Sequence, residues 1–425
     1  MSLENILDNV VRGFFRTVNK LIVSGAEEVK RVNKEKLISS GVSNLPINKQ
    51  RELFDEVFND LGLISIDGKL PYFECETPLS EFATVYSFST FIPEREWLVN
   101  KELLETYLDI KILSIEQAID DNRIIHILSQ TSPLPISCDW DNDYITELDH
   151  CFALGMSNTG IIEMDIEKYP HAFIAGETGS GKSNLLKCLI YQALNKYYEV
   201  VLIDFKRGVS FSDFEDYVTI HYEYDDVIKT LKAMVAETSN RLDKFRKAKV
   251  DNLNDYIDTT GDFLNRIFIF IDELAELLKT RNREYANALN DSIESLTRLS
   301  RAAGIHLIMG IQRPDSTIIS GQIKNNVTYR ICGKFADKEP SRIMLGSDIA
   351  STLPNVKGRF FVKDDRFREI QAFYFNLRPT SVATDSLPLM LDEPPKAVDD
   401  VILSEDEKET PTVKEMIFDF SDFKK

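Results

Sequence analysis

The central part of the chain alternates short apolar runs with longer stretches in which apolar residues recur at helical spacing. Four apolar runs are predicted to be buried strands, and they cover residues 171–175, 200–204, 267–271 and 306–311. The helical spacing predicts long helices over residues 184–195, 225–249 and 285–303. Strands that alternate with helices are typical of a parallel sheet covered by helices. The predicted fold class is therefore α/β, with a parallel-rich central sheet.

The regions on either side have other patterns. Residues 1–45 carry apolar positions near helical spacing, which predicts an N-terminal helical segment. Residues 46–150 mix period-two and helical stretches, which predicts a small α+β domain. The alternating α/β domain covers residues 151–380. Residues 381–425 are rich in proline and acid and lack periodicity, so we expect a flexible acidic tail.

The strongest chemical signal lies between the first predicted strand and the helix that follows it. There the sequence fits the P-loop pattern G-x-x-x-x-G-K-[ST]. In this pattern the glycines allow a tight turn, Lys182 reaches the β- and γ-phosphates, and the Ser183 hydroxyl binds Mg²⁺. The start of the helix favours bound anions, so ATP and Mg²⁺ are the expected cofactors. The predicted nucleotide-binding residues are Gly176, Glu177, Thr178, Gly179, Ser180, Gly181, Lys182, Ser183 and Asn184.

A second motif follows the predicted strand 267–271, which ends in Asp272 and Glu273. Open α/β sheets bind ligands at the carboxyl ends of their strands, so both acids are expected near the P-loop. Asp272 is predicted to hold Mg²⁺, and Glu273 to polarise the water that attacks the γ-phosphate. The alternative is a buried strand followed by a helix whose first turn is acidic, a common arrangement. The P-loop favours the catalytic interpretation.

Composition restricts the functional classes. The net charge of -19 argues against a simple basic nucleic-acid binder, although a ring-shaped motor needs only a few basic pore residues to grip phosphates. The five cysteines form no C-x-x-C pair, which is typical of a cytoplasmic protein without a zinc site or disulfides. No apolar run approaches the roughly 18 residues that span a bilayer, so we expect no direct membrane insertion. The acidic tail is either a docking peptide for a protein partner or a free terminus.

Further motifs resemble those of the FtsK/SpoIIIE family of DNA translocases. They follow the family's order and spacing at residues 169–176, 252–256, 300–307, 312–314, 319–324 and 329–331. The resemblance covers residues from about 150 to 375, with a weaker similarity over 75–150 to the small domain that precedes the motor. It implies a RecA-like motor that assembles as a homo-hexamer around double-stranded DNA and moves it by ATP hydrolysis. We expect neither the membrane region nor the winged-helix module of chromosome-segregating members.

The resemblance also implies roles for residues outside the two motifs. Gln312 corresponds to the polar sensor of the γ-phosphate. Arg330 and Arg342 lie where the family carries arginines, and Arg301 is a third candidate for an arginine finger that acts on a neighbouring subunit's nucleotide. Each arginine has a structural alternative, as the partner of a surface carboxylate. Residues 204–208, at a strand end, contribute to the pocket or pore, or form a solvated turn.

The function expected from these patterns is ATP-driven translocation of double-stranded DNA. A short relative of the segregating motors fits the transfer or segregation of plasmid, phage or integrative-element DNA. One alternative is an ATPase of the same fold that couples hydrolysis to protein cargo or secretion-type transfer. A nucleotide-regulated assembly protein that hydrolyses little is a second alternative, and Glu273 argues against it.

Overall fold

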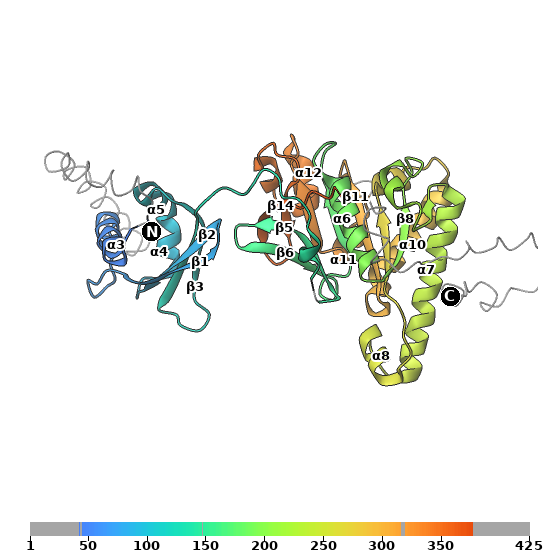
Figure 1. The fold of residues 1–425 in the computed structure, drawn as a ribbon, viewed down its shortest axis with the longest axis horizontal. Helices are drawn as coiled ribbons and strands as arrows, with labels where there is room; N and C mark the ends of the chain where they lie inside the picture. Colours follow the sequence, from blue (N-terminus) through green and yellow to red (C-terminus); the bar gives the residue numbers. More distant parts are fainter. Residues whose placement is uncertain (1–41, 43–44, 147, 316–318, 377–425) are drawn as a thin grey trace, which may run out of the picture. The chain divides into compact units, whose positions relative to one another are not determined.

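The structure of this chain is a computed structural model that describes residues 42, 45–146, 148–315 and 319–376 (Figure 1). Contacts within the chain divide it into two compact units, one ending at Pro133 and one beginning at Leu134. The predicted N-terminal helical segment lies almost entirely outside the described residues, and the predicted acidic tail lies wholly outside them. Most of the predicted small α+β domain falls in the first unit, and the predicted α/β domain falls in the second.

The first unit is a four-stranded antiparallel sheet with helices packed on one face. The strand order is β1-β2-β4-β3, and alternate residues of the inner strands point into an aromatic core. Phe88 packs edge-on against Phe54 and Phe58, with ring centroids 4.9 and 5.2 Å away. The elements are α3 (Ile47–Leu61), β1 (Tyr72–Ser80), β2 (Ala83–Ser89), α4 (Glu94–Val99), α5 (Lys101–Leu108), β3 (Lys111–Gln117) and β4 (Ile124–Gln130).

The second unit is built on a ten-stranded sheet with the order β6-β5-β14-β13-β12-β7-β11-β10-β8-β9. The strands from β12 to β9 in this order are parallel, and the remaining four pair antiparallel. The strands are β5 (Cys151–Ser157), β6 (Gly160–Asp165), β7 (Ala172–Ala175), β8 (Glu199–Ile203), β9 (Ile220–His221), β10 (Ile267–Ile271), β11 (Ile305–Ile311), β12 (Tyr329–Gly333), β13 (Arg359–Lys363) and β14 (Phe367–Ala372).

Helices cover both faces of this sheet (Figure 1). Along β10, Phe268 and Phe270 pack into the cluster that contains α6, whereas Ile269 and Ile271 pack into the cluster that contains α7 and α10. Burial on both faces explains why the strand is a continuous apolar run. The structure thus confirms the predicted α/β fold class. The helices are α6 (Lys182–Asn195), α7 (Tyr224–Ala248), α8 (Leu253–Thr260), α9 (Leu274–Leu278), α10 (Arg283–Ala303), α11 (Gly321–Asn326) and α12 (Lys338–Leu345), with 3-10 turns η2 (Asn142–Tyr144), η3 (Val209–Phe214) and η4 (Ile349–Thr352).

The boundary between the units differs from the expected one at residue 150. The buried Arg359 guanidinium donates hydrogen bonds to the carbonyls of Leu134 (3.2 Å) and Pro135 (2.8 Å). Trp140 packs edge-on against Phe373, with 5.6 Å between ring centroids. Residues from Leu134 onward therefore belong to the second unit. These contacts join positions more than two hundred residues apart, which a local sequence pattern does not reveal.

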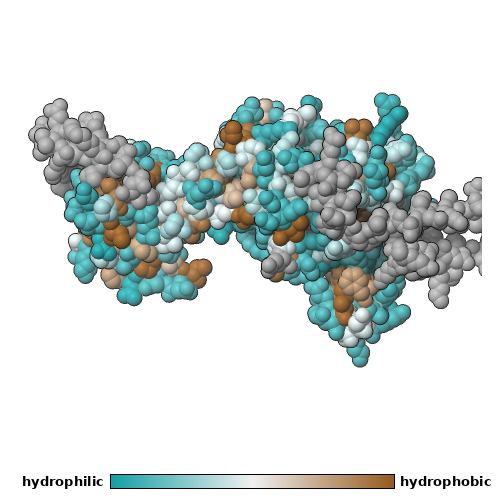
Figure 2. Space-filling model, in the orientation of Figure 1, coloured by the Kyte–Doolittle hydropathy of each residue, from teal (hydrophilic) through white to brown (hydrophobic). Residues whose placement is uncertain are grey.

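The face of the molecule drawn in Figure 2 is mostly hydrophilic among the described residues, with scattered apolar positions. None of the helices in the described ranges combines the length and apolar character that a membrane span requires. The C-terminal end of α7 projects beyond the sheet together with α8 (Figure 1). This projection has a small core of its own around Phe245, Leu253 and Tyr256.

Two buried histidines lie where β7 and β11 begin. The His171 Nδ1 atom accepts a hydrogen bond from the Leu307 amide (3.1 Å), and the His306 Nδ1 atom is 3.1 Å from the Pro170 carbonyl. Both side chains are fully enclosed. Burial lowers the pKa of His171 to about 3, and burial also lowers the pKa of His306 well below its usual value. Both imidazoles are therefore neutral in the folded protein at neutral pH.

We predict that stability falls as the pH drops below the ordinary histidine pKa of about 6.5. The unfolded chain then binds protons that the folded chain excludes, so protonation favours unfolding. At pH 5, His171 alone should cost about 2 kcal/mol. Urea unfolding at pH 7 and pH 5 measures this loss. His171→Asn should reduce the loss, while the partly exposed control His150→Asn should keep it; an equal loss in all three proteins would contradict the prediction.

Candidate active site

The P-loop connects the end of β7 to the start of α6. Gly179 and Gly181 have φ angles of +87° and +103°, a region that side chains with a Cβ atom rarely adopt. The Ser180 carbonyl accepts a hydrogen bond from the Gly358 amide (2.8 Å), which braces the loop from the β13 side of the sheet. Helix α6 begins at Lys182 without a side-chain cap. Its first amide groups are therefore available to an anion, as a phosphate site requires.

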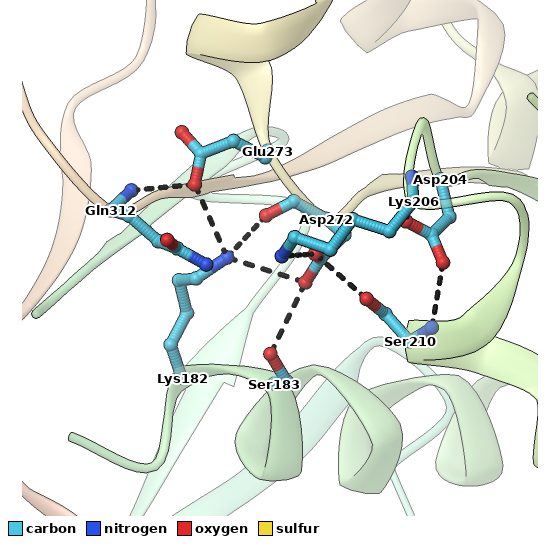
Figure 3. Close-up of polar contacts among 8 residues, drawn as sticks. All are labelled: Lys182, Ser183, Asp204, Lys206, Ser210, Asp272, Glu273 and Gln312. Carbon is cyan, nitrogen blue, oxygen red and sulfur yellow. Dashed lines mark hydrogen bonds and ion pairs between the residues drawn. The ribbon is translucent and has the colours of Figure 1, made fainter. Parts of the chain in front are cut away.

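Parallel pairing brings the second motif to the same place. Strands β7, β11 and β10 are neighbours that run in the same direction, so their carboxyl ends share one edge of the sheet. The Lys182 Nζ atom donates to the main-chain carbonyl of Asp272, lies 3.3 Å from Asp272 Oδ1, and lies 3.8 Å from Glu273 Oε2 (Figure 3). The side chains of Lys182 and Asp272 are only 4% and 1% exposed. The two motifs form one buried, charged cluster.

The two acids of this cluster differ in their electrostatics. Burial raises the pKa of Asp272, but the positive charges of Lys182 and Lys206 outweigh burial and hold the pKa below its usual value. Burial also raises the pKa of Glu273, and here Lys182 and the Gln312 amide offset only part of the effect. Asp272 is thus suited to remain an anion that faces a cation. Glu273 is the better proton acceptor of the two.

Glu273 and Gln312 meet beside an open pocket. The main-chain amide of Gln312 donates a hydrogen bond to Glu273 Oε2 (2.8 Å). The other carboxylate oxygen, Glu273 Oε1, is buried without a hydrogen-bond partner. Both residues line a pocket of about 860 Å³, together with Glu177 and Thr178 of the P-loop. The Glu273 side chain therefore borders a space large enough for phosphate groups and a water molecule. This is the position that a residue activating water needs.

The oxygen atoms around α6 fit a magnesium ion bound with a nucleotide. The Ser183 hydroxyl donates to Asp272 Oδ1 (3.2 Å) at the start of the helix. Mg²⁺ is usually bound through one or two protein oxygens, with phosphates and waters as its other ligands. Within the described ranges, no cluster of three or more histidine, cysteine or acidic side chains is arranged to hold a metal. The Ser183 and Asp272 oxygens therefore suit a Mg²⁺ ion whose other ligands come from a nucleotide and water.

Asn184, predicted to bind nucleotide, uses its side chain for another contact. Its Nδ2 group donates to the Phe375 carbonyl (2.7 Å), and its Oδ1 atom accepts from the Phe375 amide (2.9 Å). These paired bonds fasten the segment after β14 to the start of α6. Any contribution of Asn184 to nucleotide binding is left to its main chain.

The Arg330 side chain is engaged within its own subunit. All three of its guanidinium nitrogens donate to main-chain carbonyls, and burial lowers its pKa from the ordinary arginine value. The carbonyls belong to Val327, Met344 and Lys324. This geometry ties β12 to the ends of α11 and α12.

The other two arginine candidates lie on different surfaces. Arg342 is 56% exposed on α12, where it pairs with Asp348 at 3.1 Å. Arg301 donates to the Glu167 carbonyl (2.9 Å), on the edge of the sheet where β7 and β11 begin. Arg301 is therefore at the opposite edge of the sheet from the P-loop of its own subunit.

The structure adds residues that the sequence did not single out. A Cβ atom on Gly310 would lie 2.1 Å from the Asp272 carbonyl and 2.8 Å from Lys182 Nζ, so only glycine fits there. A glycine inside an apolar strand was the available signal. Lys206 and Ser210 both contact Asp272 (Figure 3). The contact of Lys206 with Asp272 favours a place for this residue in the pocket over a solvated turn. No pattern in the sequence indicated Ser210.

Sequence comparison finds proteins similar to this chain among DNA translocases. The sequence profile of the FtsK/SpoIIIE family matches residues 149–316. The chain is 33% identical over 201 residues to DNA translocase FtsK of Campylobacter jejuni, covering 44% of this chain and 21% of that protein. It is 30% identical over 213 residues to DNA translocase FtsK of Staphylococcus aureus, covering 45% of this chain and 26% of that protein. The chain thus spans about a quarter or less of the length of these relatives.

Solved structures give a longer match. The pCW3 conjugation coupling protein TcpA, solved as a monomer with ATPγS, is 36% identical. The match has a TM-score of 0.58 and covers 79% of this chain and 99% of that one. EssC of Geobacillus thermodenitrificans shares only the fold, with 18% identity and a TM-score of 0.51 over 57% of this chain and 48% of that chain. With similarity over nearly the whole of TcpA and a P-loop site assembled from both predicted motifs, this chain belongs to the FtsK/SpoIIIE family.

Proposed function

We propose that this protein hydrolyses ATP to move double-stranded DNA as a ring-shaped motor, in the transfer of plasmid or other mobile-element DNA. The convergence of Lys182, Asp272, Glu273 and Gln312 at one edge of the sheet carries the ATPase part. The match to a conjugation coupling protein and to DNA translocases supports DNA as the cargo. The alternative is a protein cargo, which is favoured if DNA fails to stimulate ATP hydrolysis.

Each residue has a task in this proposal. The P-loop amides and Lys182 bind the phosphates, and Ser183 and Asp272 hold Mg²⁺, which neutralises phosphate charge and orients the γ-phosphate. Glu273 Oε1, buried and without a partner, accepts a proton from the attacking water. The Gln312 amide fixes the other oxygen of the same carboxylate, and the Gln312 side chain is assigned to sensing the γ-phosphate.

Four basic side chains near the catalytic edge are candidate contacts for DNA phosphates, in a chain of net charge -19 whose acids Glu177, Glu276 and Asp337 line the same pocket. Lys279, Arg281 and Arg283 are exposed in the connection between α9 and the first turn of α10, directly after the Glu273 end of β10. Arg313 is exposed next to Gln312, and it lines the same pocket as Lys279. Basic side chains that follow two catalytic strands are well placed to couple phosphate contacts on DNA to the hydrolysis site.

ATP hydrolysis by the purified chain, with and without linear double-stranded DNA, tests the proposal. We expect stimulation by DNA that weakens between about 50 and about 200 mM salt, because phosphate contacts release counterions. Lys182→Ala should reduce hydrolysis by about 100-fold or more, as expected for losing a charge-stabilising donor. Lys187→Ala, on the same helix but paired with Asp213, is the matched control. Hydrolysis that ignores DNA at every salt concentration would favour protein cargo.

Glu273→Gln should separate binding from turnover. The amide keeps the shape of the side chain but is a poor proton acceptor, so hydrolysis should fall by about 100-fold while ATP stays bound. Equilibrium binding of a fluorescent ATP analogue, measured beside steady-state turnover, distinguishes the two effects. Glu284→Gln, exposed in the first turn of α10, controls for loss of a nearby negative charge. Normal turnover in Glu273→Gln would refute the assignment of Glu273.

For the arginine that acts across a subunit interface we infer Arg342 in place of Arg330. Arg342 is exposed on α12, whereas the Arg330 nitrogens are occupied by carbonyls of the same subunit. An arginine finger has to leave its own surface and reach a neighbour's γ-phosphate. Of Arg330 and Arg342, only Arg342 is held by a solvent-exposed ion pair, with Asp348, that can exchange for such a contact. Arg330 is then a structural residue that fixes the position of α12.

Mixing subunits tests this assignment. Arg342→Ala mixed with wild-type protein should lower ATP hydrolysis more steeply than dilution, because each mutant subunit disables its neighbour's site. Lys338→Ala is the control, since Lys338 lies on the same helix and near the same Asp348 carboxylate, at 3.6 Å. A linear decline across Arg342→Ala mixing ratios would exclude a role in trans.

A further inference from the structure

Asp272 is held from a second side by a loop that belongs to neither P-loop ATPase motif. The loop follows β8 and runs from Asp204 to Ser210. The Lys206 Nζ atom lies 2.8 Å from Asp272 Oδ2, and the Ser210 hydroxyl donates to the same oxygen at 2.9 Å (Figure 3). Strand β8 pairs directly with β10, opposite β11. The loop therefore approaches the carboxylate from the side of β8.

The loop is built to present these two side chains. The buried Asp204 carboxylate accepts hydrogen bonds from the amide of Lys206 (3.0 Å) and from the amide of Ser210 (2.7 Å). One carboxylate thereby joins both ends of the loop. Between them, Arg207 and Gly208 take positive φ angles of 59° and 77°, which turns the chain sharply. A position that forces a non-glycine residue into this region is sparsely populated and often marks a functional constraint.

The two oxygens of Asp272 have separate partners. Oδ1 is near Lys182 (3.3 Å) and accepts from the Ser183 hydroxyl (3.2 Å), both at the P-loop. Oδ2 is used by Lys206 and Ser210. This division sets the rotation of the carboxylate, so that one oxygen faces the metal-binding hydroxyl of Ser183. Without the grip on Oδ2, rotation about the terminal side-chain bond would be restrained only from the P-loop side.

We propose that Lys206 and Ser210 are positioning residues that orient Asp272 for Mg²⁺ through its far oxygen. The proposal rests on the ATPase function proposed above and adds a second layer to its metal site. Groups that orient a metal-binding side chain typically change metal affinity by about 10- to 100-fold when they are removed. Lys206 also supplies positive charge, but Ser210 reaches the same oxygen without any charge. Orientation is therefore separable from charge by experiment.

The test measures how much Mg²⁺ the full chain needs to bind the fluorescent nucleotide mant-ATP at equilibrium, with no turnover involved. Lys206→Met and Ser210→Ala should each raise the half-saturating Mg²⁺ concentration by about 10-fold. Ser210→Thr keeps the hydroxyl and should restore the wild-type value. Arg207→Ala is the matched control, because Arg207 is exposed in the same loop. In an Asp272→Asn background, Lys206→Met should have no further effect on the Mg²⁺ requirement.

Four results would overturn the proposal. If Lys206 acted by charge alone, Lys206→Met would lower the Mg²⁺ requirement and Ser210→Ala would leave it unchanged. If the loop were only structural, both variants would lower the melting temperature without shifting the Mg²⁺ requirement. Failure of the wild-type chain to bind mant-ATP would overturn the proposed ATPase function, and this inference with it. Normal wild-type binding with unshifted variants refutes the positioning role alone. Ser210→Ala removes a single hydroxyl, so the test does not depend on Lys206→Met folding normally.

Discussion

The buried contact between Lys182 and Asp272 is the interaction on which the site depends. Both side chains are almost fully enclosed, and burying a charge is costly unless a partner and hydrogen bonds compensate it. Several groups compensate the buried charge, since the Asp272 carboxylate also accepts hydrogen bonds from Ser183, Lys206 and Ser210. No single element supplies these groups: they come from the P-loop, α6 and the loop after β8. The charge cluster is therefore also a packing constraint that joins those elements.

The parallel sheet makes this constraint possible. Strands β7, β11, β10 and β8 are neighbours that end at one edge, so the loops after them converge. Strand β11 lies between the two motif strands. Because Gly310 has no side chain, the Lys182 Nζ atom can reach the Asp272 carbonyl across β11. Alternate residues of β10 enter different cores on the two faces, so a shift in register would displace Asp272 and the core together. The register that packs the apolar faces of β10 is therefore the same register that places Asp272 at the edge of the sheet.

The strands at the other end of the sheet support the nucleotide site from outside the motifs. The Gly358 amide bonds to Ser180 of the P-loop, and Asn184 fastens the main chain of Phe375 to α6. Arg330 braces β12 against α12 in a similar way, through carbonyls. The side chains of Asn184 and Arg330 thus bond to main-chain groups of neighbouring segments, whereas the side chains around Asp272 and Glu273 bond to one another.

Local patterns were enough to predict the α/β class, the central strands and the two motifs, because each depends on residues that are close in sequence. An apolar run indicates a strand buried on both faces, and the glycine spacing of the P-loop encodes its turn. The unit boundary near Leu134, the carbonyl contacts of Arg330, the need for Gly310 and the grip of Lys206 and Ser210 on Asp272 were decided only by the tertiary structure. Each depends on a partner far away in the chain, and the sequence alone does not specify which distant atoms a side chain will meet.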